Sequence, residues 1–524
     1  MTTFSRRWLL IIVLLVANAA TAAPEAPLTE QQRAMHVLNR LGYGPRPGDV
    51  DRVVAMGVDR YISQQLNPDS ISESATLNKA LAQRATVNLS YAELFRDYAE
   101  PVIKERRAEK TEKKDGEAVD KDKTQRHAER QVGREAMEAR LMRALDNPRQ
   151  LEEVMSEFWF DHFNVFIGKG LDRAWIAPYE RDAIRPHALG KFRDLLGATA
   201  HSPAMLFYLD NWQSSVAGAP RRKGGGKEGG LNENYARELM ELHTLGVDGG
   251  YTQQDVTELA RILTGWSFDR QALRAGHGDG FRFDPRRHDS GEKILLGKSF
   301  RADGEREGER ALDLLAEHPS TAHHIAFELA QFFVADEPPA ALVDKLAKRF
   351  TATDGDIRAV LGTLFKSEEF WNAANIGTKF KSPYRYVISS LRAADVQPND
   401  FRPVIGLLSQ LGMPLYGCVT PDGYKNTQAA WLTPGALTAR ISFATGLGTG
   451  HMPLARANIK GREVDMDGDA DQIPKGVNLP PPDLDRLLVT VSPQLSSATR
   501  SAVDKAPKPL RAGLVLGSPE FQRY

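Results

Sequence analysis

The stretch that most constrains the fold is residues 231–268, LNENYARELMELHTLGVDGGYTQQDVTELARILTGWSF. Its apolar residues recur every three or four positions, the spacing typical of two amphipathic helices. Asn232 is expected to cap the first helix and Gly246 to end it, because glycine accepts the left-handed backbone conformation. Thr252 and Asp255 give the second helix a capping-box-like start. The sequence therefore predicts a mainly α, multi-helix globular domain with a central helical hairpin at 231–268 and few or no short strands.

Glu238 departs from the amphipathic pattern of this hairpin. On a helical wheel it falls beside Leu242 and Leu245, inside the apolar face. Burying a bare carboxylate costs several kcal/mol, so Glu238 is expected to be paired, hydrogen-bonded or protonated in the interior. His243 lies on the other flank of the apolar face and is a candidate ligand or counter-ion. The hairpin is therefore predicted to form one wall of a buried polar site.

The segment NENYARELMELHTLGVDGGYTQQDV resembles the signature of a large family of exported bacterial proteins, known as domain of unknown function number eighteen hundred. The resemblance extends to HVLNRLGYGPRPGDV at 36–50, FWFDHFNVF at 158–166 and SPEFQ at 518–522, and so covers nearly the whole mature chain. It implies a mainly helical exported protein and brings no established activity. Members of the family often carry a histidine where this chain has Phe160, so a role for a histidine there is absent or altered.

A further helix expected within 148–166 places His162 near the middle of a wide apolar face. A single histidine on such a face is more often a satisfied core residue than a ligand. Glu238 favours the ligand interpretation, since two buried polar groups are readily each other's partners. Arg185 is the candidate counter-ion of Glu238.

Two loops carry further candidate ligands. His288 and Asp289 follow a short strand expected at 281–283, and they are candidate catalytic or metal-binding residues. The alternative is a turn in which Asp289 caps the backbone. Asp465, Asp467 and Asp469 resemble the start of a calcium loop, but the sequence lacks the glycine and glutamate that an EF-hand needs, so a solvated acidic loop is favoured.

The helical block at 308–395 contains the adjacent histidines His323 and His324. Neighbouring side chains on a helix point about 100° apart, which is poor geometry for one metal ion. Both histidines are therefore expected to be structural.

Composition limits the function classes. The chain of 524 residues carries 68 basic and 68 acidic side chains, and this balance speaks against a nucleic-acid binder. Cys418 is the only cysteine, so no intramolecular disulfide can form.

The expected organisation is a signal peptide at 1–22, N-terminal helices at 23–100, a charged insertion at 101–135 and a helical core domain at 136–524 with loops at 212–230, 269–305 and 412–482.

The N-terminus predicts export. Arg6 and Arg7 precede an apolar run from Trp8 to Val16, and Ala20-Thr21-Ala22 forms an A-x-A cleavage pattern. We expect cleavage after Ala22 and a periplasmic or secreted protein. A general-secretory signal is favoured over a twin-arginine signal, because the run is strongly hydrophobic. No second long apolar stretch follows, so no transmembrane anchor is expected once the signal is removed.

Two function classes fit these observations. The favoured one is an exported helical binding or scaffold protein of the cell envelope that acts with a partner. The resembled family is often encoded beside exported proteins that look like alkaline-phosphatase relatives, which suggests such a partner. The alternative is a metal-assisted hydrolase or oxidoreductase with a buried His/carboxylate site, for which the candidates are His162, Glu238, His243 and the pair His288 and Asp289. No HExxH motif, nucleophile elbow or phosphate loop is present. The sequence identifies no cofactor, substrate or oligomeric state.

Overall fold

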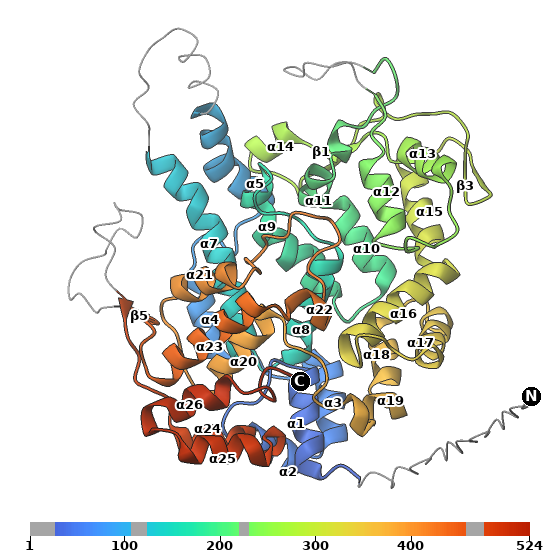
Figure 1. The fold of residues 1–524 in the computed structure, drawn as a ribbon. Coiled ribbons are helices and arrows are strands. Elements are labelled where there is room, and N and C mark those ends of the chain that lie inside the picture. The colour runs from blue at the N-terminus through green and yellow to red at the C-terminus, as the bar shows by residue number, and fades with distance from the viewer. Residues whose placement is uncertain (1–26, 106–122, 220–229, 457–475) are drawn as a thin grey trace, which may run out of the picture.

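The computed structural model describes residues 27–105, 123–219, 230–456 and 476–524. Helices dominate these ranges, and their strands form three two-stranded antiparallel ribbons. The mainly α prediction is therefore confirmed (Figure 1). The signal peptide, the middle of the charged insertion and the calcium-like segment at 465–471 lie outside the described residues.

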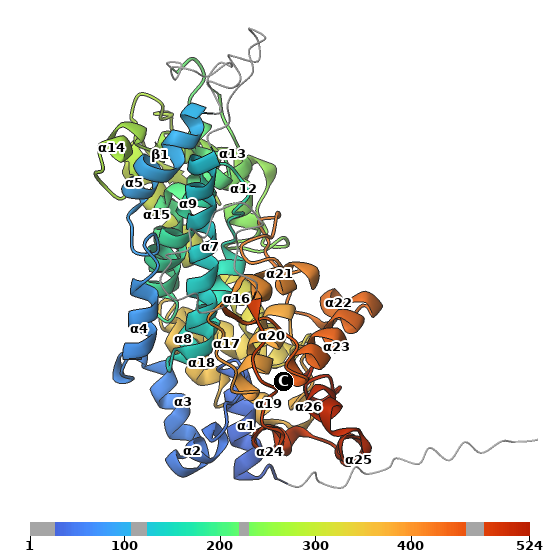
Figure 2. The same ribbon diagram turned by 90° about the vertical axis from the view of Figure 1, so that its left-hand side faces the viewer.

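The first part of the chain, as far as α11, builds the base, the left-hand side and the centre of the molecule as drawn in Figure 1. The long helix α7 lies on the left of the molecule in Figure 1, and α8 lies near its centre. Figure 2 shows α7 along the middle of the molecule. The helices of this part are α1 (Glu30–Arg40), α2 (Asp49–Met56), α3 (Val58–Leu66), α4 (Ala75–Ala82), α5 (Tyr91–Leu94), α7 (Lys123–Asp146), α8 (Gln150–His162), α9 (Asp172–Pro178), α10 (Phe192–His201) and α11 (Pro203–Tyr208). The wide apolar face predicted on α8 is present, with Leu151, Val154 and Trp159 fully buried.

The central hairpin is present and is shorter than the sequence predicts. It consists of α12 (Asn234–Glu241) and α13 (Gln253–Ile262). Thr252 caps α13 in a capping box with Asp255, as expected. Asn232 does not occupy the N-cap position of α12, which is taken by Glu233. The expected end at Gly246 is also wrong, because the helix stops at Glu241.

Strand ribbons follow the hairpin. Its last residues form β1 (Trp266–Phe268), which pairs with the strand expected at 281–283, β2 (Phe281–Phe283). The second helix is expected to carry its apolar stripe to Trp266, and this is wrong, because α13 ends at Ile262 and Gly265, with a positive φ of 85°, turns the chain into β1. The remaining elements of this region are α14 (Arg270–Arg274), β3 (Lys293–Leu295), β4 (Lys298–Phe300) and α15 (Glu305–Ala316).

The last part of the chain returns to the first. Helices α24 to α26 lie beside the N-terminal helix α1 at the base of the molecule (Figure 2). The elements of this part are α16 (Pro319–Phe333), α17 (Ala340–Ala352), α18 (Ile357–Leu364), α19 (Glu368–Trp371), α20 (Pro383–Ala393), α21 (Arg402–Gln410), α22 (Gln428–Trp431), α23 (Pro434–Gly448), β5 (Ala455–Arg456), β6 (Gly476–Val477), α24 (Leu484–Val491), α25 (Ser497–Lys505) and α26 (Lys508–Leu516).

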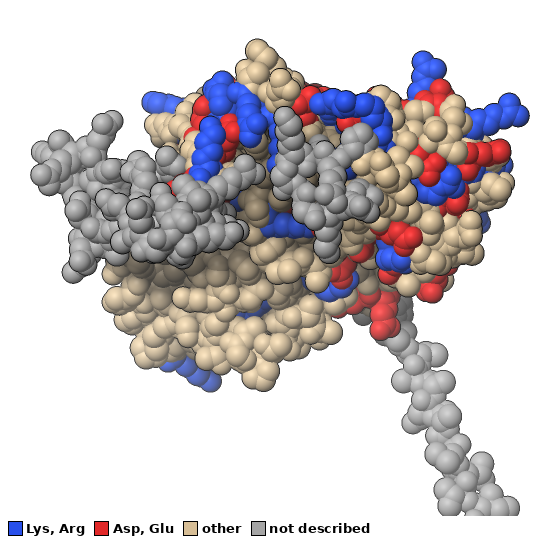
Figure 3. All heavy atoms as spheres, turned by 90° about the horizontal axis from the view of Figure 1, so that it is seen from above, with Lys and Arg blue, Asp and Glu red and all other residues tan. Residues whose placement is uncertain are grey.

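One contiguous apolar core runs through all of these parts, from Ala34 in α1 to Phe521 near the end of the chain. Seen from above, charged side chains gather along one side of the visible face, and the uncovered part of the opposite side shows few of them (Figure 3). Within the described ranges, none of the helices combines the length and the apolar character needed to cross a bilayer.

Candidate functional site

The site begins with the way α12 ends. The amide of His243 donates to the carbonyl of Glu238 at 3.0 Å, and the amide of Leu245 donates to the carbonyl of Met240 at 2.9 Å. These bonds span five residues, so the last turn is wider than an α-helical turn. The carbonyls of Leu242 and His243 then lie beyond the helix and need donors from elsewhere. Two imidazoles supply them.

His162, the last residue of α8, is the inner imidazole. Its side chain is only 2% exposed. Its Nε2 lies 3.1 Å from the carbonyl oxygen of His243, and its Nδ1 lies 2.7 Å from Oε2 of Glu328. A carbonyl oxygen only accepts, so Nε2 carries a proton and donates it. Nδ1 therefore faces the carboxylate either as a second N–H of an imidazolium or as a lone pair that binds a cation.

His324 and Glu328 lie one turn apart on α16. Nε2 of His324 is 3.1 Å from the carbonyl oxygen of Leu242 and 3.6 Å from Oε1 of Glu328. One ligand atom from each of His162, His324 and Glu328 lies within 4.8 Å of the other two. We call these three residues the His–His–Glu cluster. The side chains of His324 and Glu328 are 22% and 29% exposed, so the cluster is closed by α8 and open to solvent along α16.

The electrostatic surroundings of the cluster favour the ionised form of Glu328. Burial raises the pKa of Glu328, but its interactions with His162, which include their hydrogen bond, and with His324 and Lys425 outweigh burial and lower the pKa overall. His243 is the reverse case, because burial and then the two neighbouring imidazoles hold its pKa well below the usual range. His243 is therefore neutral, and its Nε2 has no hydrogen-bond partner among the described residues.

A loop at 417–425 covers the end of α8. Asn164 donates to the carbonyls of Cys418 and Thr420 and so ties the loop down. Gly423, at a φ of 59°, is packed so closely that a Cβ there would lie 2.1 Å from the carbonyl oxygen of Asp161. Burial under this loop raises the pKa of Asp161 to about 8. The site therefore has a carboxylic acid that stays protonated at neutral pH beside His162 in the sequence.

The structure does not place Glu238 as predicted. Its side chain is half-buried, and no hydrogen bond or ion pair to it is found among the described residues. Burial and the charges of Glu241 and Asp422 raise its pKa, with no imidazole contributing. The prediction failed because α12 ends three residues after Glu238. Residues 242–245 therefore leave the helical wheel on which Glu238 fell inside the apolar face.

Arg185 is not the counter-ion of Glu238. It binds Glu153 at 2.7 Å and Glu180 at 3.1 Å instead. Tyr416 donates to the same Glu180 carboxylate at 2.8 Å. Arg185 follows the π-helical turn η3 (Tyr179–Ile184), which directs it toward the acidic side chains of α8 and η3 and away from α12.

His288 and Asp289 belong to a separate buried network. Nδ1 of His288 lies 2.9 Å from the carbonyl oxygen of Thr264, and Nε2 lies 3.1 Å from Oε1 of Glu307. Asp289 binds Arg261 at 2.8 Å and accepts the amide of Gly291 at 2.8 Å. These contacts match the turn-forming alternative for Asp289. Neither residue joins the metal-ligand group that contains His162.

Sequence reasoning missed His324 and Glu328. The signal was present as a histidine followed four residues later by a glutamate, a spacing that puts both on one helix face. Because His323 and His324 are adjacent, both are expected from the sequence to be structural, and His324 is not paired there with Glu328. His323 is exposed on the outer face of α16, and only His324 turns inward.

Comparison with known proteins gives a family and no activity. Residues 36–523 match a family model described as a protein of unknown function, DUF1800. No curated protein and no solved structure matches the chain. The match covers every residue of the His–His–Glu cluster and nearly the whole described structure. The chain therefore belongs to the DUF1800 family of proteins of unknown function.

Proposed function

We propose that the protein binds a divalent transition-metal ion through His162, His324 and Glu328 and acts as a metal-assisted hydrolase or oxidoreductase. The observation that carries the proposal is the convergence of three ligand atoms, from α8 and α16, within 4.8 Å of one another. Two histidines and one carboxylate are the donor set of many catalytic zinc and non-haem iron sites.

The surroundings of the cluster support this proposal. A metal-binding histidine usually donates its other N–H to a carbonyl or carboxylate, which fixes the ring. His162 does so through Nε2 to the carbonyl of His243, leaving Nδ1 for the ion. Three protein ligands leave coordination positions for water or substrate, and the partly exposed His324 and Glu328 mark the side from which these would enter. His324 would exchange its bond to Leu242 for the metal.

Elemental analysis of the purified protein tests the proposal. We expect about one zinc or iron per chain, a lower melting temperature after chelation, and recovery when the metal is returned. Glu328→Gln and His324→Asn are expected to lose the metal. His323→Asn is the matched control, because His323 lies next to His324 but faces solvent. A metal-free protein that binds neither added zinc nor added iron, or metal retained by both variants, would contradict the proposal.

A second candidate role is binding to a partner protein of the cell envelope. Residues 426–454, which include α22 and α23, contain no Asp, Glu or Lys, and their single Arg440 is fully buried. Leu432 and Ile441 are 39% and 55% exposed on this segment. An uncharged surface with exposed aliphatic side chains fits a protein partner that has a similarly uncharged patch.

The partner expected from the family resemblance is an exported protein that looks like an alkaline phosphatase. The test is direct binding of such a protein from the same organism, measured by sedimentation. Ile441→Glu is expected to abolish the complex. Val489→Glu, at another exposed aliphatic residue, is expected to leave the complex intact. No complex with the native chain, or a complex that survives Ile441→Glu, would exclude this surface.

We also propose that the protein is periplasmic or secreted. The support is the sequence from Arg6 to Ala22, which lies outside the described residues. Mass spectrometry of the exported protein is expected to find Ala23 as the first residue. Replacing Arg6 and Arg7 by lysines is expected to leave export intact if the general-secretory route is used. A chain retained in the cytoplasm with its first residues intact would exclude export.

A further inference from the structure

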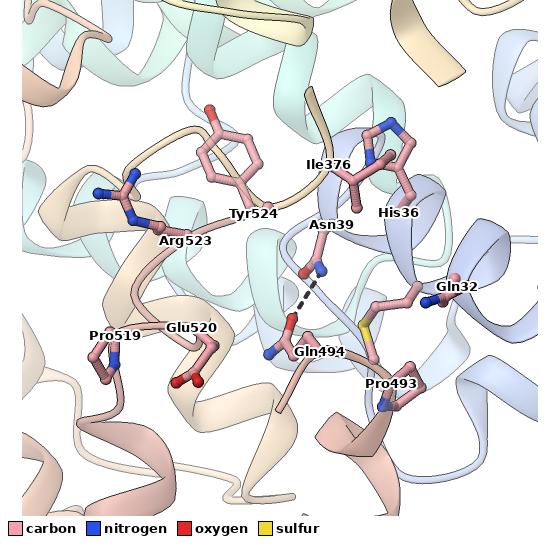
Figure 4. A pocket seen from close by; sticks show the side chains of 12 residues that line it. Gln32, His36, Asn39, Ile376, Pro493, Gln494, Pro519, Glu520, Arg523 and Tyr524 are labelled. Carbon is pink, nitrogen blue, oxygen red and sulfur yellow. Dashed lines mark hydrogen bonds between the residues drawn. The ribbon is translucent and has the colours of Figure 1, made fainter. Parts of the chain in front are cut away.

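A cavity of about 430 Å³ lies where the two ends of the described chain meet (Figure 4). Its walls come from α1, the 3-10 turn η7 (Ser492–Gln494), the segment around Ile376 and the residues after α26. Met35 and Ile376 give it apolar surface. The size is that of a small-molecule site. The cavity shares no lining residue with the His–His–Glu cluster.

Buried positive charge lies behind one wall of this cavity. The ring of Tyr524 lines the cavity. The guanidinium carbons of Arg40 and Arg385 lie 4.7 and 4.4 Å from the centre of this ring. Arg40 is fully buried and Arg385 is 3% exposed. Arg40 donates to the carbonyl of Asn375, and Arg385 donates to the carbonyl of Asn39, so these bonds bring no negative charge.

The two arginines retain unused donors. Nε and Nη1 of Arg40 and Nη2 of Arg385 have no hydrogen-bond partner among the described residues. Neither arginine forms an ion pair in the described part of the chain. Burial lowers the pKa of Arg40, while Tyr524 and then the carboxylate of Asp336 act to raise it, and Asp336 is itself bound by Lys379. The region therefore carries buried positive charge that is only partly compensated, and such charge is costly without an anion nearby.

His36 and Arg523, which also line the cavity, are consistent with a positive electrostatic potential there. Nε2 of His36 donates to the carbonyl of Phe370 at 3.0 Å, and burial and the charge of Arg40 hold the His36 pKa well below its usual range. Arg523 lines the cavity beside Tyr524, and its hydrogen bond goes to the carbonyl of Thr378. A cavity with a cationic wall and a neutral histidine attracts a negatively charged group.

The cavity also offers a free hydrogen-bond donor. Oε1 of Gln494 accepts a bond from Asn39 at 3.3 Å, drawn in Figure 4, which leaves the amide hydrogens of Gln494 for a ligand. The one acidic side chain among the lining residues is that of Glu520. The Thr499 hydroxyl lies 3.0 and 2.9 Å from its two oxygens, and the amide of Ser496 donates to Oε1 at 3.3 Å.

We propose that this cavity binds a small organic anion, with an oxyanion head group (carboxylate or phosphate) near Arg523 and Gln494 and an apolar body against Met35 and Ile376. The proposal is independent of the metal site. It predicts that the cavity prefers ligands that carry both a negative charge and an apolar tail. A positively charged surface alone would not require the tail.

Calorimetry with three six-carbon probes tests the proposal. Hexanoate and hexyl phosphate carry the two oxyanion heads, and hexanamide has the same body without charge. We expect at least one anion to bind with one site per chain, roughly tenfold or more tighter than hexanamide. Binding of one anion and not the other would identify the head group. No anion binding, or equal binding of hexanamide, would overturn the proposal.

Variants that change one charge in the cavity wall sharpen the test. Gln494→Glu keeps the acceptor for Asn39 but adds a negative charge, and is expected to weaken anion binding roughly tenfold. Glu520→Gln removes a negative charge and is expected to strengthen binding, a result that misfolding does not produce. Arg511→Gln is the control, because Arg511 also binds backbone carbonyls but lies outside the cavity. Unchanged affinity in both cavity variants would also overturn the proposal.

Discussion

His162 of α8 and Glu328 of α16 are in direct contact at the site, with Nδ1 2.7 Å from Oε2. The same imidazole is anchored through Nε2 to the carbonyl of His243, which the wide end of α12 leaves unpaired. Three elements far apart in the sequence are therefore joined by one histidine ring. The contact between His162 and Glu328 therefore links α8, α16 and the end of α12. Together with the nearby His324, these two residues form the metal-ligand set.

The first prediction concerns the stability that Glu328 provides without metal. Glu328→Gln in chelated protein replaces a charge-assisted bond to His162 by a weaker one, and is expected to lower the free energy of unfolding by about 1–3 kcal/mol. Urea unfolding at neutral pH measures the difference. His323→Asn, on the exposed face of α16, is expected to change stability by less than about 0.5 kcal/mol.

This contribution depends on pH. The pKa of Glu328 is lowered in the folded protein, so its stabilising effect is complete above its ordinary value near 4.5. The effect is lost as pH falls through the lower folded value. The stability gap between the native chain and Glu328→Gln is therefore expected to shrink as pH falls below about 4.5. A gap that grows as pH falls below this value would contradict the contact assigned between Glu328 and His162.

Much of this architecture could be predicted from the sequence, because apolar periodicity and helix caps are local signals. The capping box at Thr252 and the apolar face of α8 are examples. The site could be predicted only in part. His162 was identified as a polar residue on an apolar face, but its partner depends on where α16 packs against α8. That packing is a long-range contact, which no local pattern encodes.

Glu238 shows why the remaining site predictions failed. A helical wheel places Glu238 in the apolar face only if α12 continues to Gly246. The chain instead widens after Glu241, and its carbonyls bind imidazoles from other elements. The widening depends on those tertiary partners and therefore could not be inferred from the hairpin sequence.

The second prediction follows for Glu238. Since burial, Glu241 and Asp422 raise its pKa, its ionised form is disfavoured in the folded state. The penalty is absent below the unfolded value near 4.5 and is complete once pH has passed the raised folded value. Glu238→Gln is therefore expected to be neutral or to stabilise the protein at pH 7 by roughly 0.5 kcal/mol. Thermal unfolding measures this, and a strong loss of stability would restore the idea of a buried, paired carboxylate.

The third prediction concerns Asp161. Its pKa of about 8 means that the folded protein keeps a proton that the unfolded chain releases near pH 3.8. Stability is therefore lost as pH rises from 4 to 8, by at most about 1.4 kcal/mol per pH unit. Asp161→Asn removes this loss, so its stability advantage over the native chain is expected to grow toward pH 8 and then level off. Asp194→Asn, on the exposed side of α10, serves as the control.

The fourth prediction concerns the buried pair Lys293–Glu307, whose side chains are both fully buried and 2.6 Å apart. Lys293→Met leaves the Glu307 carboxylate without its cation and is expected to cost about 3–5 kcal/mol. Lys298→Met, at an exposed lysine of the same ribbon, is expected to have little effect. Adding Glu307→Gln to Lys293→Met removes the stranded charge and is expected to recover part of the loss.

Urea unfolding of the four proteins of this cycle gives the coupling energy between Lys293 and Glu307. Burial opposes ionisation of Glu307, but its bonds to Lys293, to the amide of Asp303 and to His288 lower its pKa overall. The coupling is therefore expected to be complete above pH 4.5, the ordinary value for glutamate, and to weaken only in stronger acid. Coupling close to zero at pH 7 would mean that the pair is not a source of stability. His288 and the amide of Asp303 would then hold Glu307 without help from Lys293, and His288→Asn would be as costly in the Lys293→Met background as in the native chain.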